Sequence, residues 1–259
     1  MPLSVASWNV NSLGARLPQV IEWLRASRPD ILLLQELKMV SEAFPHEAFG
    51  DIGYTAAVHG QKTYNGVAIV SRLRLEDVQR GLGHGDPDPA QARYIEALVD
   101  GRVRIASIYV PNGEDMGTPK YDYKMAFYKS LAALVAGIIA SEEPYIIGGD
   151  FNVAASPIDT HDPEGWKDRI LFSEPERAAL RRLFAAGLVD TFRTLHPTRR
   201  EYSWWDYRGG SFPQNKGARI DYILASPHAV GGLIEARIDA SPRGNERPSD
   251  HVPVMAQWG

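Results

Sequence analysis

The stretch LSVASWNVNSLGARLPQVIEWLRASRPDILLLQE, residues 3–36, decides the fold. Residues 3–10 predict a β-strand. A helix with one buried face is predicted next, because apolar residues recur at i, i+3, i+4 and i+7: Leu17, Val20, Ile21 and Leu24. The residues SRPD at 27–30 end this helix, and ILLL at 31–34 predicts a buried strand. The chain therefore opens with a strand–helix–strand unit.

The same mixture of strands and helices continues along the chain. Further strands are predicted over residues 66–71, 94–99, 103–110, 145–148, 219–224 and 252–256. Apolar residues on one helical face predict a long helix: Phe127, Leu131, Leu134, Val135 and Ile138. Ser173 with Glu176 is a capping-box signal for another helix. Several strands follow one another directly, which favours an α/β sandwich with mixed sheets over a pure barrel. No repeat or linker interrupts residues 1–259, so we expect one domain.

Composition excludes several classes of protein. The chain has 259 residues, of which 44% are hydrophobic and 23% charged, as in globular proteins, and it has no cysteine. A disulfide framework, a thiolate zinc site and a cysteine nucleophile are therefore excluded. The longest strictly apolar run, residues 131–140, is shorter than the ~20 residues that cross a bilayer. No targeting segment precedes the first strand, so we expect a cytoplasmic protein without a membrane partner.

Polar side chains lie at the ends of the predicted strands: Asn9, Asn11, Glu36, Tyr109, Asp150, Asn152, Asp221, Asp250 and His251. In α/β folds such strand ends gather into one crevice, where ligands bind. Taken singly, each residue also has a structural interpretation. Asp150 and Asn152 follow two glycines and could be turn formers, and His251 could be a core histidine. Their coincidence at so many strand ends favours a phosphate-handling metal site.

The type of ligand narrows the metal. The carboxylates and amides at the strand ends offer hard oxygen donors, which suit Mg²⁺ or Mn²⁺. The zinc motif H-E-x-x-H is absent, as are a P-loop, a G-x-G-x-x-G after a strand and a G-x-S-x-G elbow. These absences argue against a nucleotide triphosphatase, a dinucleotide oxidoreductase and a serine hydrolase.

One segment, residues 193–219, is both basic and aromatic. It carries six basic and two acidic residues, a net charge of +4, whereas the whole chain is −4 and the remainder therefore −8. Interleaved aromatic rings accompany the charge: Tyr202, Trp204, Trp205, Tyr207 and Phe212. Cations beside flat rings are the ingredients of nucleic-acid recognition. The alternative is a solvated loop whose tryptophans anchor the core, and at least one of Trp204 and Trp205 is expected to be structural.

Seven motifs in order resemble the exonuclease III-type AP endonucleases of the endonuclease/exonuclease/phosphatase superfamily. They are SWNVN at 7–11, LQE at 34–36, YVPNG at 109–113, GGDFNV at 148–153, YSWWDYR at 202–208, RIDY at 219–222 and SDH at 249–251. The GDFN and SDH motifs mark the superfamily alone, whereas YSWWDYR and RIDY point to its DNA-repair branch. The resemblance implies a four-layer α/β sandwich with two mixed β-sheets flanked by helices and the site at one edge. It also implies hydrolysis of the DNA phosphodiester 5′ to an abasic site, with 3′→5′ exonuclease and 3′-end repair activity.

The resemblance also implies roles for the residues at the strand ends. It implies a Mg²⁺ site, in which Mn²⁺ can substitute, formed by Glu36, Asn9, Asn11 and Asp250. Asp150, helped by Asn152, would orient or deprotonate the attacking water. Tyr109, and His251 held by Asp221, would donate hydrogen bonds to phosphate oxygens.

For substrate binding, the resemblance implies a monomer that binds double-stranded DNA with abasic or damaged 3′ ends. Trp204 would pack against the flipped-out abasic sugar. The remaining DNA contacts would come from Arg93, Asn112, Arg208, Lys216 and Arg219. Two positions depart from the family: some members carry Asp in place of Asn11, and Ala218 is small where many carry a bulky residue. A looser pocket wall is therefore expected at Ala218.

Two other functions are consistent with these residues. A phosphodiesterase or phosphatase of the same superfamily could act on a phosphoester other than DNA, as the acidic net charge suggests. A non-catalytic DNA-binding or scaffolding protein could be built on the same fold. The presence of every expected catalytic residue argues against the second alternative.

Overall fold

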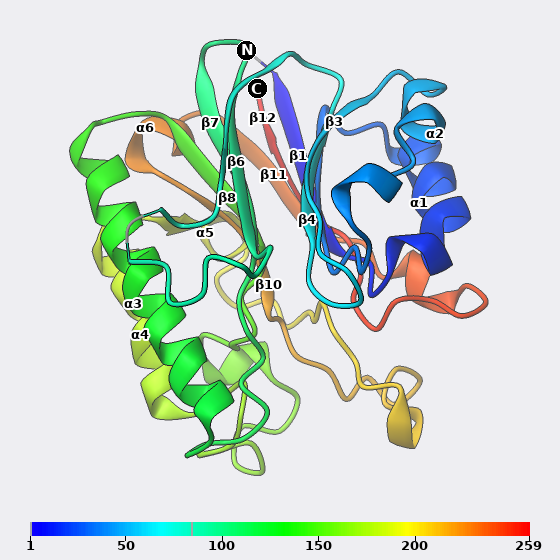
Figure 1. Cartoon of the computed structure of the whole chain (residues 1–259). Coiled ribbons are helices and arrows are strands. Elements are labelled where there is room, and N and C mark those ends of the chain that lie inside the picture. The colour runs from blue at the N-terminus through cyan, green and yellow to red at the C-terminus, as the bar shows by residue number, and fades with distance from the viewer. Residues whose placement is uncertain (1, 84) are drawn as a thin grey trace.

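Two six-stranded sheets pack face to face, with helices on both outer sides (Figure 1). This is a computed structural model, and it describes residues 2–83 and 85–259. The predicted four-layer α/β sandwich with two mixed sheets is confirmed.

The first sheet has the order β11-β12-β1-β2-β4-β3. Its strands are β11 (Leu233–Ile238), β12 (Val254–Trp258), β1 (Leu3–Asn9), β2 (Ile31–Gln35), β4 (Val67–Ser71) and β3 (Thr55–His59). β1 and β2 are parallel, and the other neighbouring pairs are antiparallel. β2 and β4 are buried along their whole length, as the apolar run of β2 predicts.

The second sheet has the order β5-β6-β7-β8-β10-β9. Its strands are β5 (Leu75–Arg80), β6 (Tyr94–Val99), β7 (Val103–Tyr109), β8 (Tyr145–Asp150), β10 (Asp221–Ala225) and β9 (Val189–Asp190). β7 and β8 are parallel, and the other neighbouring pairs are antiparallel.

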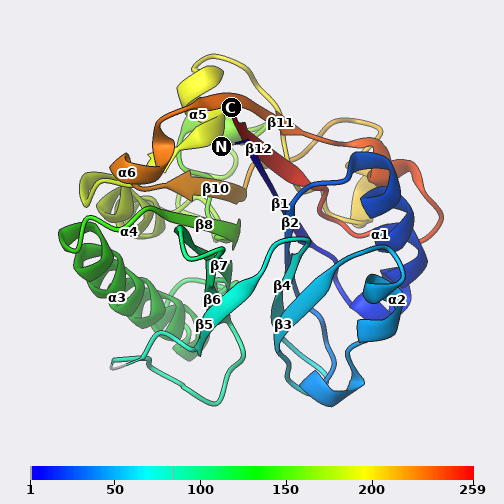
Figure 2. The ribbon, with the colours of Figure 1, turned by 90° about the horizontal axis from the view of Figure 1, so that it is seen from above.

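Helices cover the outer faces of both sheets (Figures 1 and 2). Next to the first sheet lie α1 (Leu13–Ser27) and α2 (His46–Gly50), and next to the second lie α3 (Pro119–Ala140) and α4 (Glu174–Ala185). Two short helices, α5 (Thr191–Leu195) and α6 (Pro227–Val230), flank β10, and single 3₁₀ turns occur at Ser41–Ala43, Pro157–Asp159, Arg208–Gly210 and Ser241–Gly244. One apolar cluster lies between the sheets, and another lies under each helical layer.

α3 is by length and composition apolar enough to cross a membrane. It begins at a Thr118 cap with Pro119 in its first turn, which is the preferred place for proline. Its side chains Phe127, Tyr128 and Leu131 are buried in the cluster that covers the second sheet. The apolar face of α3 is thus accounted for by packing within the fold.

α4 begins as the sequence predicts. The Ser173 hydroxyl and the Glu176 carboxylate form a reciprocal capping box at its first turn. This arrangement satisfies backbone N–H groups that have no partner within a helix.

Candidate active site

The carboxyl ends of four strands meet at one edge of the sandwich. β1 and β2 run parallel with Asn9 opposite Gln35, and β7 and β8 run parallel with Tyr109 opposite Asp150. The residues that follow these four strands therefore lie at this edge, as expected for ligand sites in α/β folds. The predicted strand-end residues come together here.

The side-chain amide of Asn9 joins the two sheets at this edge. The buried Asn9 side chain donates from Nδ2 to Glu36 Oε1 at 2.8 Å and to Asp150 Oδ2 at 3.0 Å. Glu36 follows β2 of the first sheet, and Asp150 ends β8 of the second. Both hydrogens of the amide are thereby used to hold two carboxylates close together.

Three residues of the site adopt left-handed backbone conformations. The φ angles are 45° at Asn11, 53° at Glu36 and 51° at Asn152. Asparagine tolerates this region, whereas glutamate rarely occupies it, and such strain is common at functional sites. The backbone of Glu36 is held there by a hydrogen bond from Ser12 N to its carbonyl at 2.8 Å. The turn aims the Glu36 carboxylate back across the edge of the sheet toward Asn9.

His251 and Asp221 form a buried pair. His251 Nδ1 lies 2.9 Å from Asp221 Oδ2, which also accepts from the Ser203 hydroxyl at 2.6 Å. Burial by itself would lower the pKa of His251, but the Asp221 and Asp150 carboxylates outweigh it and raise the pKa to about 10. The imidazole is therefore protonated at neutral pH, and its Nε2, 3.7 Å from Asp150 Oδ2, remains available to donate.

Asp150 is buried at the centre of the site. Burial raises the pKa of Asp150 to about 7, against the opposing effect of the His251 cation. Asn152 donates its backbone N–H to Oδ1 at 2.9 Å and its amide to Oδ2 at 3.1 Å. A carboxylate whose pKa lies near neutrality can both accept and release a proton under ordinary conditions.

The donors at the site fit a hard divalent cation. One potential ligand atom each from Glu36, Asp150 and His251 lies within 4.8 Å of the other two. The two carboxylates supply the oxygen ligands that Mg²⁺ and Mn²⁺ prefer. The protonated imidazole of His251 is not a ligand in that state, so the groups that could hold a cation are the carboxylates and the neighbouring amide oxygens.

Asn11 and Asp250 lie beside this group and are bound to each other. Asn11 Nδ2 donates to Asp250 Oδ1 at 2.9 Å, and Trp204 Nε1 donates to Asp250 Oδ2 at 3.0 Å. Lys38, which was not among the predicted site residues, donates to Asn11 Oδ1 at 2.5 Å and forms an ion pair with Glu36 at 3.0 Å. A lysine two residues after the acidic residue was the available signal for this contact.

Tyr109 and Arg93 form a stacked pair on the other side of the site. The Arg93 guanidinium lies 4.8 Å from the centre of the Tyr109 ring. Burial raises the pKa of Tyr109 well above its ordinary value, and the Glu36 and Asp150 carboxylates add to the effect. The phenol therefore stays protonated and can donate a hydrogen bond.

A buried lysine that the sequence analysis missed fixes two loops of the site. Lys124 of α3 donates to the carbonyl oxygens of Asn112 at 3.0 Å and Asn152 at 2.7 Å, and it forms an ion pair with Glu176. The side chains of Lys124 and Glu176 are both 0% exposed. Asn112 in turn donates to Asn152 Oδ1 at 3.0 Å. A cationic residue within an apolar helical face was the signal for this anchor.

The basic and aromatic segment, residues 193–219, divides into buried and exposed parts. Trp205 is buried, so the expectation that one of the two tryptophans is structural is confirmed. Trp204 is partly exposed and lies beside His251, with 6.5 Å between the ring centres. Arg208 and Lys216 are exposed and remain predicted DNA contacts.

The prediction that Arg219 contacts DNA is wrong for this structure. Its side chain is 1% exposed and forms ion pairs with Asp159 at 2.7 Å and Asp190 at 2.8 Å. A guanidinium with these buried partners cannot reach a phosphate without breaking both ion pairs. Arg219 instead connects β10 to the loop after β8.

The pocket wall at Ala218 is filled by neighbouring side chains. Ala218 is buried in an apolar cluster against which Trp166 and Trp204 pack. The Trp166 and Trp204 rings lie 6.3 Å apart in an edge-to-face arrangement, and Trp166 meets His161 at 5.5 Å in the same way. Trp166 thus occupies space beside the small side chain of Ala218.

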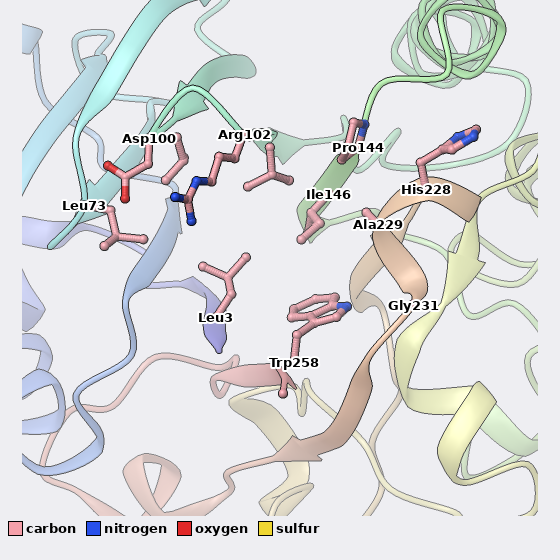
Figure 3. A pocket seen from close by; sticks show the side chains of 13 residues that line it. Leu3, Leu73, Asp100, Arg102, Pro144, Ile146, His228, Ala229, Gly231 and Trp258 are labelled. Carbon is pink, nitrogen blue, oxygen red and sulfur yellow. The ribbon is translucent and has the colours of Figure 1, made fainter. Parts of the chain in front are cut away.

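A separate cavity of about 260 Å³ opens at the opposite end of the sandwich (Figure 3). It is lined mainly by apolar side chains, including Leu3, Ile146 and Trp258, with Asp100 and Arg102 at one side. Leu3 begins β1, whereas Asn9 ends it, so this cavity is remote from the catalytic edge.

Comparisons with known proteins agree with this geometry. The model of the endonuclease/exonuclease/phosphatase family matches residues 6–251. The chain is 35% identical to exodeoxyribonuclease III of Haemophilus influenzae, with 97% of this chain and 98% of the relative covered. Among solved structures, the 3′ phosphatase NExo from Neisseria, bound to a product DNA hairpin, gives a TM-score of 0.95 at 43% identity. An AP endonuclease from Archaeoglobus fulgidus gives 0.94 at 37% identity, and each comparison covers 99% of both chains.

Proposed function

Because this chain belongs to the endonuclease/exonuclease/phosphatase family and is a phosphodiesterase of the exonuclease III type, we propose that it is a Mg²⁺-dependent DNA repair nuclease. Its substrates are the phosphodiester 5′ to an abasic site and damaged or phosphorylated 3′ ends. One observation carries the proposal: two carboxylates held by Asn9 face an imidazolium held by Asp221. The named relatives support DNA as the substrate, because one of them is bound to a DNA hairpin.

The residues that would hold the cation are Glu36 and, next to it, Asn9, whereas Asp150 stays free to accept a proton. A divalent cation there supplies positive charge to a phosphate oxygen and so lowers the barrier to attack on the anionic ester. Asp250 is bound to Asn11 and Trp204 and would act on the cation from further away.

The protein's own side chains supply the proton transfers. Asp150 accepts a proton from the attacking water as the new P–O bond forms and the P–O bond to the leaving oxygen breaks, and the leaving oxygen takes a proton from solvent. Asn152 holds the Asp150 carboxylate in place. His251 and Tyr109 donate hydrogen bonds to phosphate oxygens, where negative charge grows in the transition state. Removal of one such donor commonly costs about 3–4 kcal/mol of transition-state stabilisation.

An abasic nucleotide is held only weakly in the DNA duplex, and its recognition can start from this difference. An abasic nucleotide lacks stacking and pairing, so its extrusion costs less than that of a normal nucleotide. The partly exposed Trp204 ring beside His251 offers a surface for the extruded sugar. Trp166 packs against Trp204 and reduces the space on this side of the site. The smaller space favours small groups such as an abasic sugar or a 3′-phosphate.

The test is a set of parallel rate measurements with Mg²⁺ on an abasic-site duplex, a 3′-recessed duplex and a 3′-phosphate duplex. We expect cleavage of DNA by the native protein and a loss of about 10²–10⁴-fold for Asp150→Asn, the range for removal of a general base. Asp51→Asn, the same change at an exposed position, is the matched control. Turnover of soluble phosphoesters without any reaction on DNA would reject the proposal in favour of a phosphatase with another substrate.

A further inference from the structure

A groove lies between the edge strands of the two sheets. β3 is an edge strand of the first sheet and β5 of the second, and the two strands lie at the same side of the sandwich (Figure 2). The groove that residues of both strands line has a volume of about 560 Å³. This volume lies within the range of about 300–1,000 Å³ that is typical of ligand-binding sites.

The groove extends toward the end of the sandwich that is remote from the active site. Its lining includes Ser71, which pairs with Ile31 at the start of β2, whereas Glu36 follows the other end of that strand. None of the residues that come together around Glu36, Asp150 and His251 lines it, as far as the structure describes the chain. The groove is therefore separate from the catalytic residues.

The floor of the groove is aliphatic. It includes Ala57, Leu73, Leu75 and Val78, of which the last three are only partly buried. No aromatic ring lines the groove among the residues that the structure describes. Single-stranded nucleic acids are bound on aromatic rings that stack on their bases, whereas an aliphatic floor favours the apolar side chains of a peptide.

Three arginines line the same groove: Arg72, Arg74 and Arg80. All three are exposed, and within the described part of the chain no acidic residue lines the groove. The groove is therefore locally positive, although the whole chain has a net charge of −4. A guanidinium can bind a carboxylate through two parallel hydrogen bonds, so three of them favour a partner that carries several carboxylates.

The ion pairs that two of these arginines form within the chain are weak. Arg74 Nη2 lies 3.2 Å from Glu76 Oε2, and Arg72 Nη1 lies 3.7 Å from Asp30 Oδ1. Exposed ion pairs of this kind contribute about 0–1 kcal/mol to stability. The carboxylates of a partner can therefore replace them at little cost.

Two features disfavour the addition of a further strand to either sheet at this groove. Arg80 donates from Nε to Val58 O at 3.0 Å, which occupies a backbone carbonyl of β3. The pairing of β5 with β6 is irregular between Glu76 and Gln79, and Asp77 between them has a φ of 45°. Bulges and charged residues protect edge strands from pairing with another chain. Recognition in the groove therefore depends mainly on side chains.

We propose that the groove between β3 and β5 is a docking site for an acidic peptide segment of a partner protein. Its carboxylates bind Arg72, Arg74 and Arg80, and its aliphatic side chains pack on the floor of the groove. The inference goes beyond the proposed function, because it involves neither the catalytic residues nor DNA. A partner bound here can hold the enzyme while the active site acts on its substrate.

The test uses the full chain and a fluorescein-labelled peptide made of four Glu-Leu repeats, with binding measured by fluorescence anisotropy. We expect saturable binding that weakens as the salt concentration rises, because exposed charges are screened. For Arg74→Glu we expect Kd to rise about tenfold or more, the effect of losing one charge-assisted hydrogen bond. Arg74→Lys keeps the charge and should bind more tightly than Arg74→Glu. A peptide with glutamine in place of each glutamate should not bind.

Arg237→Glu is the matched control. Arg237 lies on β11, the other edge strand of the first sheet, and pairs with Glu235 at 3.1 Å, much as Arg74 pairs with Glu76. This variant should bind the peptide as the native protein does. Both charge-reversal variants should cleave an abasic-site duplex at the native rate, since neither residue lies at the active site.

The inference is overturned if the acidic peptide shows no saturable binding, or if Arg74→Glu and Arg237→Glu lose affinity equally. It is also overturned if a labelled oligothymidylate binds more tightly than the peptide and its binding depends on Arg74, because the groove would then be a nucleic-acid site. Failure of the native protein to cleave DNA would reject the proposed function and leave this inference intact.

Discussion

His251 owes its charge to its neighbours. Burial alone would favour the neutral imidazole, yet the adjacent carboxylates of Asp221 and Asp150 raise the pKa of His251 to about 10. The group is therefore charged over the whole neutral range, which a histidine in water is not. Asp221 is the closer partner, at 2.9 Å from Nδ1.

Asp221→Asn removes the carboxylate that raises the pKa of His251 the most. We expect the pKa of His251 to fall, so that the imidazolium is lost at a lower pH than in the native protein. The kcat/KM of the variant should fall further below that of the native enzyme at pH 9 than at pH 6, as measured by a pH–rate profile on abasic duplex DNA.

Ser203→Ala provides the comparison, because it removes a hydrogen bond to Asp221 but leaves the carboxylate charge. Its profile should keep the native shape. A parallel drop of Asp221→Asn at all pH values would show that the carboxylate positions His251 without setting its charge.

Single residues also show where sequence patterns stop being informative. The strand-end positions of Asn9, Glu36 and Asp150 were sufficient to predict that they meet, because parallel strands end at one edge. The burial of Arg219 was not predictable, since its partners Asp159 and Asp190 lie 60 and 29 residues away. The net charge of a basic segment does not show which of its arginine and lysine side chains are exposed to solvent.

At the scale of elements, a polar seam crosses the interior behind the site. Gln35 Nε2 of β2 donates to Ser7 Oγ at 3.1 Å and to Ser107 Oγ at 3.0 Å. Ser7 belongs to the first sheet and Ser107 to the second, two residues before Tyr109. The seam therefore fixes the two sheets relative to each other at the level of Glu36 and Tyr109.

Gln35→Leu removes the bridge and leaves two buried hydroxyls with fewer partners. We expect a loss of about 1–3 kcal/mol in the free energy of unfolding, the usual cost of an unsatisfied buried group. We also expect a higher Mg²⁺ concentration at half-maximal activity, because Glu36 is less well placed. Urea unfolding and a Mg²⁺ titration measure the two effects, and an unchanged titration would contradict the positioning role.

A buried ion-pair network joins β10 to the loop after β8. Asp159 accepts from Arg219 at 2.7 Å and from Arg193 at 2.6 Å. Burial opposes the ionised carboxylate, but the two guanidinium groups outweigh it and hold the pKa of Asp159 below its ordinary value. These two ion pairs therefore stabilise the fold at pH values above the pKa of an aspartate in the unfolded chain. The stabilisation is lost as the pH falls below about 4.

For Asp159→Asn we expect a loss of about 3 kcal/mol at pH 7, since breaking one side of a buried ion pair leaves an uncompensated charge. The difference between variant and native protein should shrink as the pH is lowered toward 3, because the aspartate of the unfolded chain then binds a proton and the advantage of the ionised native carboxylate declines. Urea unfolding at pH 7, 5 and 3 measures this trend. A difference that stays constant across these pH values would argue against the ionic origin of the effect.

Elements with a strong apolar pattern were predictable, and edge strands were not. The strand at Tyr94–Val99 and the capping box of α4 match the prediction. The strands β5 and β11 were missed because they lie at sheet edges and have almost no fully buried position, which removes the apolar signal. β9 has two residues, too few for any periodicity.

At the scale of the molecule, charge is distributed unevenly. The net charge is −4, yet the segment at residues 193–219 is +4 and exposes Arg208 and Lys216. Part of this positive charge is neutralised within the fold, since Arg219 and Arg193 are paired with Asp159. An acidic protein therefore exposes a local positive surface, where we propose that DNA binds.

We expect the affinity for duplex DNA to fall steeply with salt, because each phosphate contact releases counterions. Arg208→Ala and Lys216→Ala should each weaken binding to every DNA sequence and reduce the slope of log Kd against log salt by about 1. Anisotropy titrations at several KCl concentrations test this. A native slope retained in both variants would place the phosphate contacts elsewhere.

A sandwich with mixed sheets was predictable from the order of strands and helices, and its four layers from the family resemblance, whereas the pairing of the sheets at the site was not. Sequence order does not state that β12, the last strand, lies next to β1, the first. The prediction that residues 1–259 form one domain stays a prediction.

Because Asn9 bridges a carboxylate from each sheet, and His251 enters just before the final strand, the reactive constellation exists only after both halves of the sandwich have closed. A polypeptide still emerging from the ribosome holds Glu36 and Asp150 long before it holds His251. A chain that has folded only as far as Asp150 therefore lacks the imidazolium that completes the constellation.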